Sequence, residues 1–330
     1  MNDDLISVVV PAYNIERYIE RSLESLLRQT YPFLEVVVVD DGSTDGTAAL
    51  IDRMAEKEPR LIAVHKPNGG VSSARIEGIR RASGQWIGFA DGDDFVEPEM
   101  FEHLLQNAIR CHADISHCGC QMVFPDGRVD LHYGTGRFVE QTNEQGVKDL
   151  VEGTFVEPGL WNKLFRRDIV EDFEQSPLWD PEIKINEDLL MNYLLFSRAE
   201  KSVYEDIPYY HYLIRKHSAS TSRTKPHVTD PLRVMDTIRN DLKGKNVLYP
   251  VAYTRYLRVL ISVANQKQWA EESRKAQRQL RQEIQSGNLT VCTSQKLRLM
   301  ALAAAYWLSA YRQVRKIHDN ITGISQKYDV

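Results

Sequence analysis

The sequence lacks most of the features of a secreted or a nucleic-acid-binding protein. It has four cysteines in 330 residues and no CxxC pair, so neither a zinc site of the usual spacing nor a disulfide framework is predicted. We expect free thiols in a reducing compartment, where disulfides are rare. The formal net charge of −5 gives no support to nucleic-acid binding. The cysteines are Cys111, Cys118, Cys120 and Cys292.

Long apolar segments are also missing. The acidic stretch at residues 1–7 has no basic region followed by an apolar run, so a signal peptide is not expected. No run of about 18 uncharged apolar residues occurs in the chain, which argues against a spanning helix. With 42% apolar and 26% charged residues, the composition predicts an ordinary globular protein in the cytoplasm.

What the sequence does contain is an alternation of strand and helix patterns over residues 1–100. Short β-branched runs predict buried strands, and the segments between them repeat apolar residues at helical spacing. This order predicts a Rossmann-like, mainly parallel sheet flanked by helices, with its ligand at the carboxyl ends of the strands. Strands are expected at 5–10, 36–39, 61–64 and 86–90, and helices at 15–27 (capped by Asn14), after Ser43 or Asp45 as cap, and at 72–82.

The pattern loosens after Pro98. A helix is expected up to Cys111, followed by a hairpin that turns at Pro125-Asp126-Gly127. Further on, residues 187–200 form a strongly periodic helix, and the polar, basic segment 215–225 reads as a loop. The rest of the chain is predicted to be helical, including one helix over 296–316.

Two acidic segments follow predicted strands directly. In Asp40-Asp41-Gly42-Ser43, a carboxylate could accept hydrogen bonds from a base or a ribose, and glycine allows close approach of the backbone. In Asp91-Gly92-Asp93-Asp94, the first and third residues can point toward one cation. Carboxylate oxygens suit Mg²⁺ or Mn²⁺. The alternatives are a capped βα turn for the first segment and a solvated acidic turn for the second.

Four motifs stand in order at four predicted strand ends: Pro11-Ala12-Tyr13-Asn14, the segment 40–43, the segment 68–75 and the segment 91–94. In this order the sequence resembles the family 2 glycosyltransferases, inverting enzymes with the GT-A fold, over roughly residues 4–220. The resemblance implies a UDP-sugar donor, Mn²⁺ or Mg²⁺, and a glycan or lipid-linked acceptor in capsule, lipopolysaccharide or similar surface-glycan synthesis.

By the same resemblance the chain has three parts. Residues 1–100 would be a nucleotide-sugar-binding half, and residues 101–225 the acceptor-binding half of the same GT-A domain. Residues 226–330 would be a helical C-terminal extension.

The resemblance assigns donor contacts to the first three motifs. Pro11 and Tyr13 would line the nucleotide base, and Asp40 would hydrogen-bond a uracil. Asp41 and Arg75 would be further donor contacts. Simple packing is the alternative for the tyrosine, and a solvated helix position for the arginine.

The fourth motif would carry the metal. Asp93 would be its main carboxylate ligand, and Asp91 would lie near both the metal and the ribose or sugar. Gly92, between them, would belong to the donor-binding turn.

An acidic pair, Glu187 and Asp188, begins the helix expected at 187–200. Acids are favoured at a helix N-terminus by its dipole, which is the structural alternative. The resemblance implies that Asp188 is the general base that deprotonates the acceptor hydroxyl, while Glu187 holds the acceptor or a loop. A positioned carboxylate can serve as such a base.

Residues 161–165 also resemble a family segment. Trp161 would form part of a sugar platform, or pack in the core, and Lys163 would approach the diphosphate, or lie on the surface. His211 is either a metal ligand or packed among aromatic residues. A residue of 211–225 would contact the diphosphate and exclude water, and the pattern does not say which.

The segment 296–316 combines apolar residues with basic residues at both ends. It could lie on the inner face of the plasma membrane with its basic side chains near anionic headgroups. Alternatively it packs on the catalytic domain or on a second subunit of a homo-oligomer.

Other functions are less well supported by the sequence. A nicotinamide dehydrogenase is excluded because no GxGxxG follows the strand at 5–10. A non-catalytic nucleotide-sugar sensor or scaffold of the same fold stays open, although the complete set of carboxylates argues against it.

Overall fold

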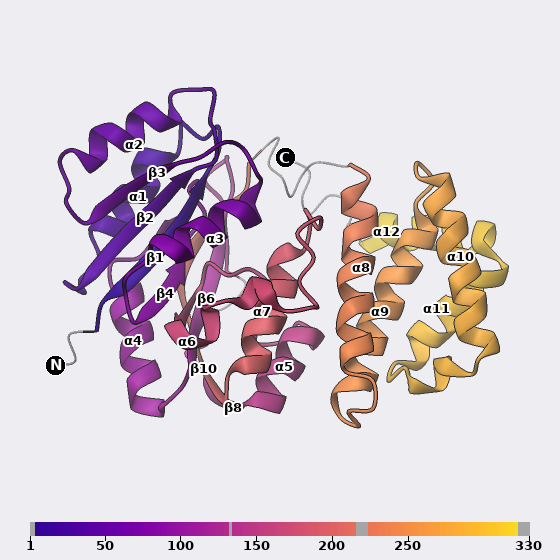
Figure 1. Ribbon diagram of the computed structural model, residues 1–330. Helices are drawn as coiled ribbons and strands as arrows, with labels where there is room; N and C mark the ends of the chain where they lie inside the picture. The colour runs from indigo at the N-terminus through magenta and orange to yellow at the C-terminus, as the bar shows by residue number, and fades with distance from the viewer. Residues whose placement is uncertain (1–3, 132–133, 216–223, 323–330) are drawn as a thin grey trace. The chain divides into compact units, whose positions relative to one another are not determined.

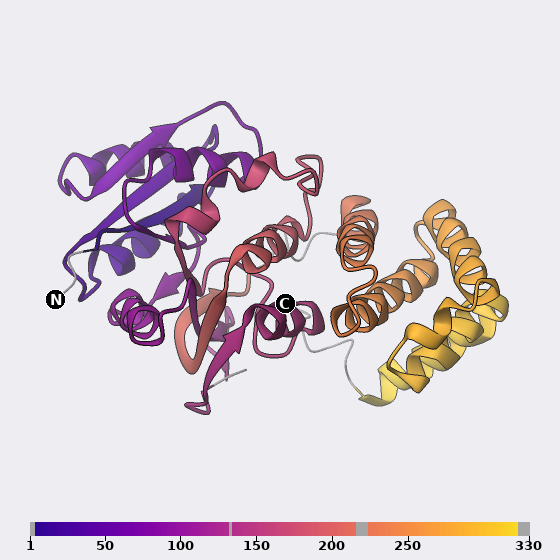
Figure 2. The ribbon, with the colours of Figure 1, turned by 60° about the horizontal axis from the view of Figure 1, so that its bottom comes forward.

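The computed structural model describes residues 4–131, 134–215 and 224–322. The chain divides into two compact units, Met1–Arg215 and Lys216–Val330, and each is described by itself. The first unit is a sheet with helices on both faces, and the second consists of helices (Figures 1 and 2).

Among its described residues, the sheet of the first unit has ten strands, eight of them in the order β3-β2-β1-β4-β9-β6-β10-β5. β3, β2, β1 and β4 pair in parallel, and beyond β4 the sheet is mixed. The strands are β1 (Ile6–Ala12), β2 (Leu34–Asp40), β3 (Leu61–His65), β4 (Trp86–Phe89), β5 (Phe95–Val96), β6 (Ile115–Val123), β7 (Val129–Leu131), β8 (Phe138–Thr142), β9 (Lys163–Arg166) and β10 (Lys201–Leu213).

Helices connect the parallel strands, as the alternating pattern predicts. The family's α/β architecture, a central sheet flanked by helices, is therefore confirmed for this unit. Its helices are α1 (Ile19–Leu27), α2 (Thr47–Ala55), α3 (Val71–Arg81), α4 (Met100–Cys111), α5 (Asn143–Glu152), α6 (Arg167–Val170), the 3₁₀ turn η1 (Phe173–Gln175) and α7 (Glu187–Arg198).

The two faces of β1 explain why this strand is apolar throughout. Val8 and Val10 belong to the core that also contains buried residues of α1 and α4. Val9 points to the opposite face, where Gly78 of α3 leaves it room: a Cβ on this glycine would lie 2.3 Å from the valine Cγ1. A strand covered on both faces has no polar alternation, so the continuous apolar run is what burial requires.

The predicted helix caps agree less well with the structure than the predicted strands do. Asn14 does not cap a helix: its backbone is left-handed (φ 51) and its Oδ1 accepts the Thr44 N–H at 2.8 Å. Ser43 likewise bonds across the two loops, because its Oγ accepts the Asn14 N–H at 3.0 Å. Asp45 does bond to the start of α2, at Thr47 N (3.0 Å). These side chains connect the end of β1 to the end of β2. The local sequence pattern does not show such contacts between separate loops.

The hairpin predicted after α4 is present. β6 and β7 are antiparallel, and the turn closes with a bond from Gly127 N to Phe124 O of 3.0 Å.

The second unit is built around α9, which packs against α8, α10 and α11. Its core side chains include Tyr253, Tyr256, Leu257 and Leu280, all fully buried. Its elements are α8 (Pro226–Asp241), α9 (Leu248–Asn265), α10 (Ala270–Gln285), the 3₁₀ turn η2 (Asn288–Val291), α11 (Gln295–Tyr306) and α12 (Leu308–Thr322).

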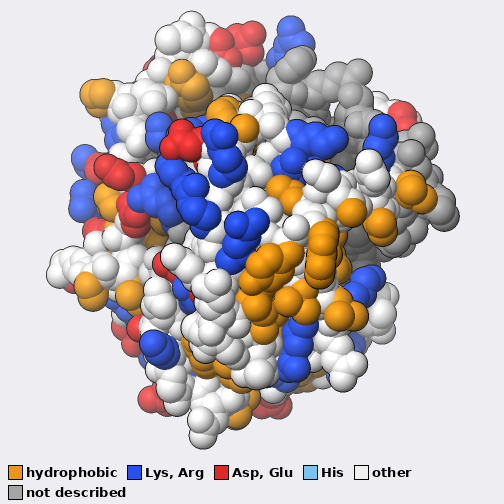
Figure 3. Space-filling view, turned by 90° about the vertical axis from the view of Figure 1, so that its right-hand side faces the viewer, with side chains coloured by type: hydrophobic (Ala, Val, Ile, Leu, Met, Phe, Trp, Pro, Cys, Tyr) orange, Lys and Arg blue, Asp and Glu red, His pale blue; other side chains and the backbone are white. Residues whose placement is uncertain are grey.

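The prediction of one helix over 296–316 is wrong. The backbone leaves the helical region at Trp307 (φ −128, ψ 44), which separates α11 from α12. Large apolar side chains are exposed on α11, at the break and on α12, with Leu299 at 68%, Trp307 at 66% and Val314 at 66%. Figure 3, which views the side of this unit, shows hydrophobic side chains gathered with Lys and Arg around them. Within the described ranges, no helix has the length and apolar character needed to cross a membrane.

Candidate active site

The parallel strands bring the conspicuous polar motifs to one edge of the sheet. The register ends at Ala12↔Asp40 between β1 and β2, and at Asp40↔His65 between β2 and β3. The acidic segment 91–94 follows β4, the other neighbour of β1. Residues from four separate parts of the sequence therefore meet where α/β sheets bind their ligands.

The turn after β4 lies directly against the end of β1. A Cβ on Gly92 would come within 2.6 Å of Ile15 Cδ1 and 3.1 Å of the Pro11 carbonyl oxygen, so a larger residue would require the Ile15 side chain and the turn to shift. Pro11 is partly buried there, whereas Tyr13 is 48% exposed. The Tyr13 ring is therefore accessible at this edge.

Asp40 is buried and bonded through both carboxylate oxygens. Its Oδ1 accepts the Ser43 N–H at 3.1 Å, and its Oδ2 lies 3.2 Å from His65 Nδ1. The local turn and a neighbouring strand thus orient the group that the resemblance assigns to a uracil.

Asp41 holds the loop between β3 and α3. Its Oδ1 accepts from Lys66 Nζ (2.6 Å) and Gly69 N (2.9 Å), and its Oδ2 accepts from Gly70 N (2.7 Å). Burial and three donors commit this carboxylate to the fold, so the structure places Asp41 as a loop anchor and does not direct it outward as a donor contact. We call Asp40 and Asp41 the base-side pair.

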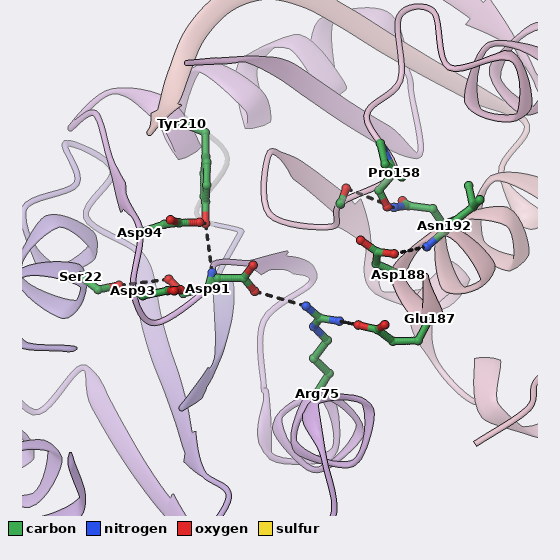
Figure 4. Close-up of polar contacts among 12 residues, drawn as sticks. Ser22, Arg75, Asp91, Asp93, Asp94, Pro158, Glu187, Asp188, Asn192 and Tyr210 are labelled. Atoms are coloured by element: carbon green, nitrogen blue, oxygen red, sulfur yellow. Dashed lines mark hydrogen bonds and ion pairs between the residues drawn. The ribbon is translucent and has the colours of Figure 1, made fainter. Parts of the chain in front are cut away.

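Arg75 connects the acidic segment 91–94 to the acidic pair at 187–188. This residue of α3 is 6% exposed, which excludes the solvated alternative. Its Nη2 lies 3.2 Å from Asp91 Oδ1, after β4, and its Nη1 lies 3.0 Å from Glu187 Oε1, at the start of α7 (Figure 4). One buried guanidinium therefore brings the expected metal turn beside the expected base.

Five carboxylates surround this link, and we call them the acidic cluster: Asp91, Asp93, Asp94, Glu187 and Asp188. Burial and the Asp188 charge raise the pKa of Glu187 to about 7, although Arg75 opposes the shift. Burial also raises the pKa of Asp188 above its usual value. Burial and neighbouring aspartates raise the pKa of Asp93, and that of Asp94 well above its ordinary range. The cluster holds more negative charge than its surroundings compensate.

Arg215 supplies a second cation to the cluster. Its Nε lies 2.5 Å from Asp93 Oδ2, its Nη2 contacts the same oxygen, and its guanidinium lies 5.0 Å from the centroid of the Tyr18 ring. The principal expected metal ligand is thus paired with the side chain that ends the first unit.

Asp94 fastens the acidic turn to the end of β10. Its Oδ1 accepts from Leu213 N at 2.7 Å, and its Oδ2 accepts from the Tyr210 hydroxyl at 2.8 Å. The same hydroxyl accepts the Asp91 N–H at 3.1 Å. This buried network orients the acidic turn and connects the turn to β10, the strand that leads to Arg215.

The acidic start of α7 has a constrained backbone. Asn186, just before the helix, is left-handed (φ 65). Asp188 Oδ1 accepts the Leu189 N–H at 2.7 Å, and the side chain is partly exposed. Helix-dipole stabilisation alone does not explain Glu187, because its carboxylate leaves the helix end to pair with Arg75.

Trp161 and Lys163 are neighbours in sequence with different environments. The indole is partly exposed and stacks on Tyr210, with ring centroids 4.4 Å apart. Lys163 is fully buried, and its Nζ donates to Glu157 O (2.8 Å), Gly159 O (2.5 Å) and Asn162 Oδ1 (2.7 Å). Its three ammonium hydrogens are thereby used, so the structure supports neither a diphosphate contact nor a surface lysine.

Burial lowers the pKa of Lys163 to about 8. Its bonds secure the loop before Trp161, and Asn192 of α7 helps by donating to Pro158 O at 2.6 Å (Figure 4).

His211 is packed. Its ring stacks on Phe95, with Nε2 2.7 Å from Glu97 Oε1 and Nδ1 hydrogen-bonded to the Gln121 amide. Both ring nitrogens are thus engaged within the fold. Of the segment expected to contact the diphosphate, residues 216–223 lie outside the described part of the chain.

Three members of the site were not identified from sequence: Asp94 as a tether, Tyr210 and Arg215. Asp94 was visible only as a third acid in its segment, and Tyr210 as one aromatic residue among several in β10. Arg215 was included in the basic segment without a role. Their functions depend on contacts over more than a hundred positions, which no local spacing reports.

Asp91 and Asp93 are the carboxylates at this edge that are expected to bind a metal. Among the described residues, no group of three or more His, Cys, Asp and Glu side chains is arranged to hold an ion alone. Mg²⁺ needs no such cage, because it usually binds one or two carboxylates together with substrate phosphates. Asp91 and Asp93 are therefore a chemically suitable partial site for a cation shared with a diphosphate.

Fold and site together define an α/β enzyme of the nucleotide-binding kind. The family pattern described as "Glycosyl transferase family 2" matches residues 7–173. The chain is 34% identical over 233 residues to "Uncharacterized glycosyltransferase EpsJ" of Bacillus subtilis (strain 168), covering 69% of this chain and 67% of that protein. It is 25% identical to "Uncharacterized glycosyltransferase YibD" of Escherichia coli (strain K12), over 96% of both proteins.

This chain belongs to glycosyl transferase family 2 and is a glycosyltransferase. Its fold is similar to that of S. aureus TarS 1-349 in complex with UDP-GlcNAc, with a TM-score of 0.74 and 23% identity. That similarity covers 97% of this chain and 92% of the TarS chain, so it includes the C-terminal helices. The GT-A fold expected from the resemblance is thereby confirmed.

Proposed function

We propose that this enzyme transfers a sugar from a UDP-sugar to an acceptor hydroxyl, with inversion at the anomeric carbon, in the assembly of a capsule, lipopolysaccharide or similar surface glycan. The two ion pairs of Arg75 carry the proposal, because they join the carboxylate after β4 to the acidic start of α7. Asp91, on the donor side, and the start of α7, which carries the expected base, then lie on either side of the Arg75 guanidinium. The TarS complexes with UDP and UDP-GlcNAc support the choice of donor class.

Asp188 would act as the general base. Leu189 N–H holds its Oδ1 and leaves Oδ2 to accept the proton of the acceptor hydroxyl. The hydroxyl oxygen bonds to the anomeric carbon as the bond from that carbon to the diphosphate breaks, and the electron pair leaves on UDP. A carboxylate with a raised pKa is a stronger base than an ordinary one, which suits this step.

Asp93 and Asp91 would hold Mn²⁺ or Mg²⁺ together with the donor diphosphate. Such an ion stabilises the negative charge that develops on the leaving group. Arg75 keeps Asp91 in place, and the Asp94–Tyr210 bond orients the turn that carries both ligands. Tyr13, exposed at the end of β1, would lie along the base, and Trp161 would offer an aromatic surface to a sugar.

A donor screen tests the proposal. Thermal unfolding is followed with UDP-, dTDP- and GDP-sugars, with and without Mn²⁺, for the wild type and Asp93→Ala. A bound donor stabilises the fold by mass action, so one UDP-sugar should raise the melting temperature of the wild type only with metal. Loss of this shift in the variant is expected. If no nucleotide sugar stabilises the protein, or one binds without any transfer to acceptors, the sensor or scaffold alternative prevails.

The second unit would contact a membrane surface from the cytoplasmic side through α11 and α12. Residues 295–317 include Lys and Arg but no Asp or Glu, and Leu299, Trp307 and Val314 among them are exposed. Apolar side chains flanked by basic ones suit an anionic headgroup layer. Full-length protein with Trp307→Ser and Val314→Ser should co-sediment less with phosphatidylglycerol vesicles than wild type. Equal co-sedimentation, or a concentration-dependent mass increase without vesicles, would favour a second copy of the chain as the occupant.

A further inference from the structure

His65 bridges two carboxylates beside the expected base pocket. It ends β3, next to Asp40 of β2 in the sheet register. Its Nδ1 lies 3.2 Å from Asp40 Oδ2, and its Nε2 lies 2.9 Å from Oδ1 of Asp52, on α2. Neither His65 nor Asp52 takes part in the proposed reaction.

The geometry specifies the protonation state of the ring. An ionised carboxylate only accepts hydrogen bonds, and a neutral imidazole has a single N–H to donate. Two carboxylate contacts on opposite nitrogens are therefore both satisfied when the ring is an imidazolium. The Asp52 contact contributes most to raising the pKa of His65, and the Asp40 contact acts in the same direction.

The two acids differ in exposure, which separates their roles. Asp40 is buried at the end of β2, whereas the Asp52 side chain is 58% exposed and lies on α2. Asp40 and Asp52 are the charged side chains that face the ring from β2 and α2. The next residue of the chain, Lys66, directs its ammonium to Asp41.

We propose that His65 is a positioning residue for base recognition, held as an imidazolium between Asp52 and Asp40 so that Asp40 is kept oriented as a hydrogen-bond acceptor. This inference rests on the proposed function, in which Asp40 contacts the donor base. Uracil presents an N3–H donor, whereas cytosine presents an acceptor at N3, so an Asp40 oxygen oriented as an acceptor favours uracil. His65 thereby contributes to the choice of UDP over CDP.

The sign of the pH dependence follows. The imidazolium is complete below the raised pKa of His65 and is lost as pH increases through it. The neutral ring then retains one N–H, and its bare nitrogen faces a carboxylate oxygen. UDP affinity due to this contact is thus present at low pH and disappears at high pH.

The test compares UDP binding by titration calorimetry, with Mg²⁺, at several pH values from 6 to 8.5 in the wild type and in His65→Gln. Glutamine is polar but does not titrate, so taking the ratio of the two dissociation constants at each pH removes the titration of the diphosphate itself. We expect the variant to bind UDP about three- to tenfold more weakly at pH 6, as for a partly exposed ion pair, and nearly equally at pH 8.5. Its preference for UDP over CDP should fall at pH 6.

Asp52→Asn is the matched variant, because it changes an exposed residue on α2. At pH 6 it should bind UDP as tightly as the wild type does. Its advantage in UDP affinity over His65→Gln should disappear at a lower pH than that of the wild type. If UDP binds but the ratio does not vary with pH, the role of His65 is overturned and the proposed function stands. If neither wild type nor variants bind UDP, the proposed function itself fails, together with this inference.

Discussion

The base-side pair and the acidic cluster lie at the same edge of the sheet, but they differ in how fully their negative charge is matched by hydrogen-bond donors and cations. The base-side pair is matched by donors: Asp41 accepts three hydrogen bonds, and Asp40 is bonded on both oxygens. The acidic cluster has five carboxylates, with ion pairs to Arg75 and Arg215, and burial raises the pKa of four of them. Acids matched by donors are held in fixed orientations, whereas undercompensated acids have charge left for a cation, a proton or a substrate.

The largest effect should come from removing the proposed base. Asp188→Asn keeps the shape of the side chain but removes its ability to take a proton, so turnover should fall about 10²- to 10⁴-fold. UDP binding should survive. Steady-state transfer assays and calorimetry measure the two quantities, with Asp126→Asn, in the exposed hairpin turn, as the control for the chemical change. Near-normal turnover would remove Asp188 from the mechanism.

Adjacent residues of the cluster provide a sharper contrast. Asp93→Asn removes the main expected metal ligand and should weaken metal-dependent UDP binding roughly 30-fold or more. Asp94→Asn should change it less than about threefold, because the oxygens of Asp94 bind Leu213 N and the Tyr210 hydroxyl. Mn²⁺-dependent calorimetry with UDP compares the two. Equal losses would mean that the turn binds the ion as a whole.

The base-side pair should show the opposite behaviour, in stability. Asp41→Ala leaves Lys66 Nζ and the Gly69 and Gly70 N–H groups without their buried acceptor, which should lower the free energy of unfolding by about 2 kcal/mol or more. Asp188→Asn should leave it unchanged or raise it, because it removes a charge from a crowded site. Urea unfolding decides. A stable Asp41→Ala variant would contradict the distinction between the two groups.

The smallest predicted effect is a pH dependence of stability. The pKa of Glu187 is raised from 4.5 to about 7, so the folded state binds more protons than the unfolded state between these values. Stability from this group is therefore present below pH 4.5 and is lost as pH rises through 7. The melting temperature without metal should fall by a few degrees from pH 6 to pH 8. Glu187→Gln should reduce that fall, and an unchanged slope would contradict the assignment.

The success of the sequence-based predictions depends on the range of the interactions involved. The strands at 36–39 and 61–64 were located from apolar runs, because burial on both faces leaves a local signal. The end of the α11 helix at Trp307 was missed, since apolar and basic periodicity continues through the break. Asn14 was misassigned as a cap, because its bonding partner Thr44 lies on another loop.

By itself the sequence determined the first four strands, the helices between them, their order and the chemical types at the four strand ends, because helix and strand periods and acidic turns are local properties. Only the tertiary structure decided which acids are matched and which are not. Arg75 meets Glu187, and Asp94 meets Tyr210, across more than a hundred positions of the chain. The charge on a carboxylate depends on burial and on neighbours within a few ångströms, and the fold brings those neighbours from distant segments.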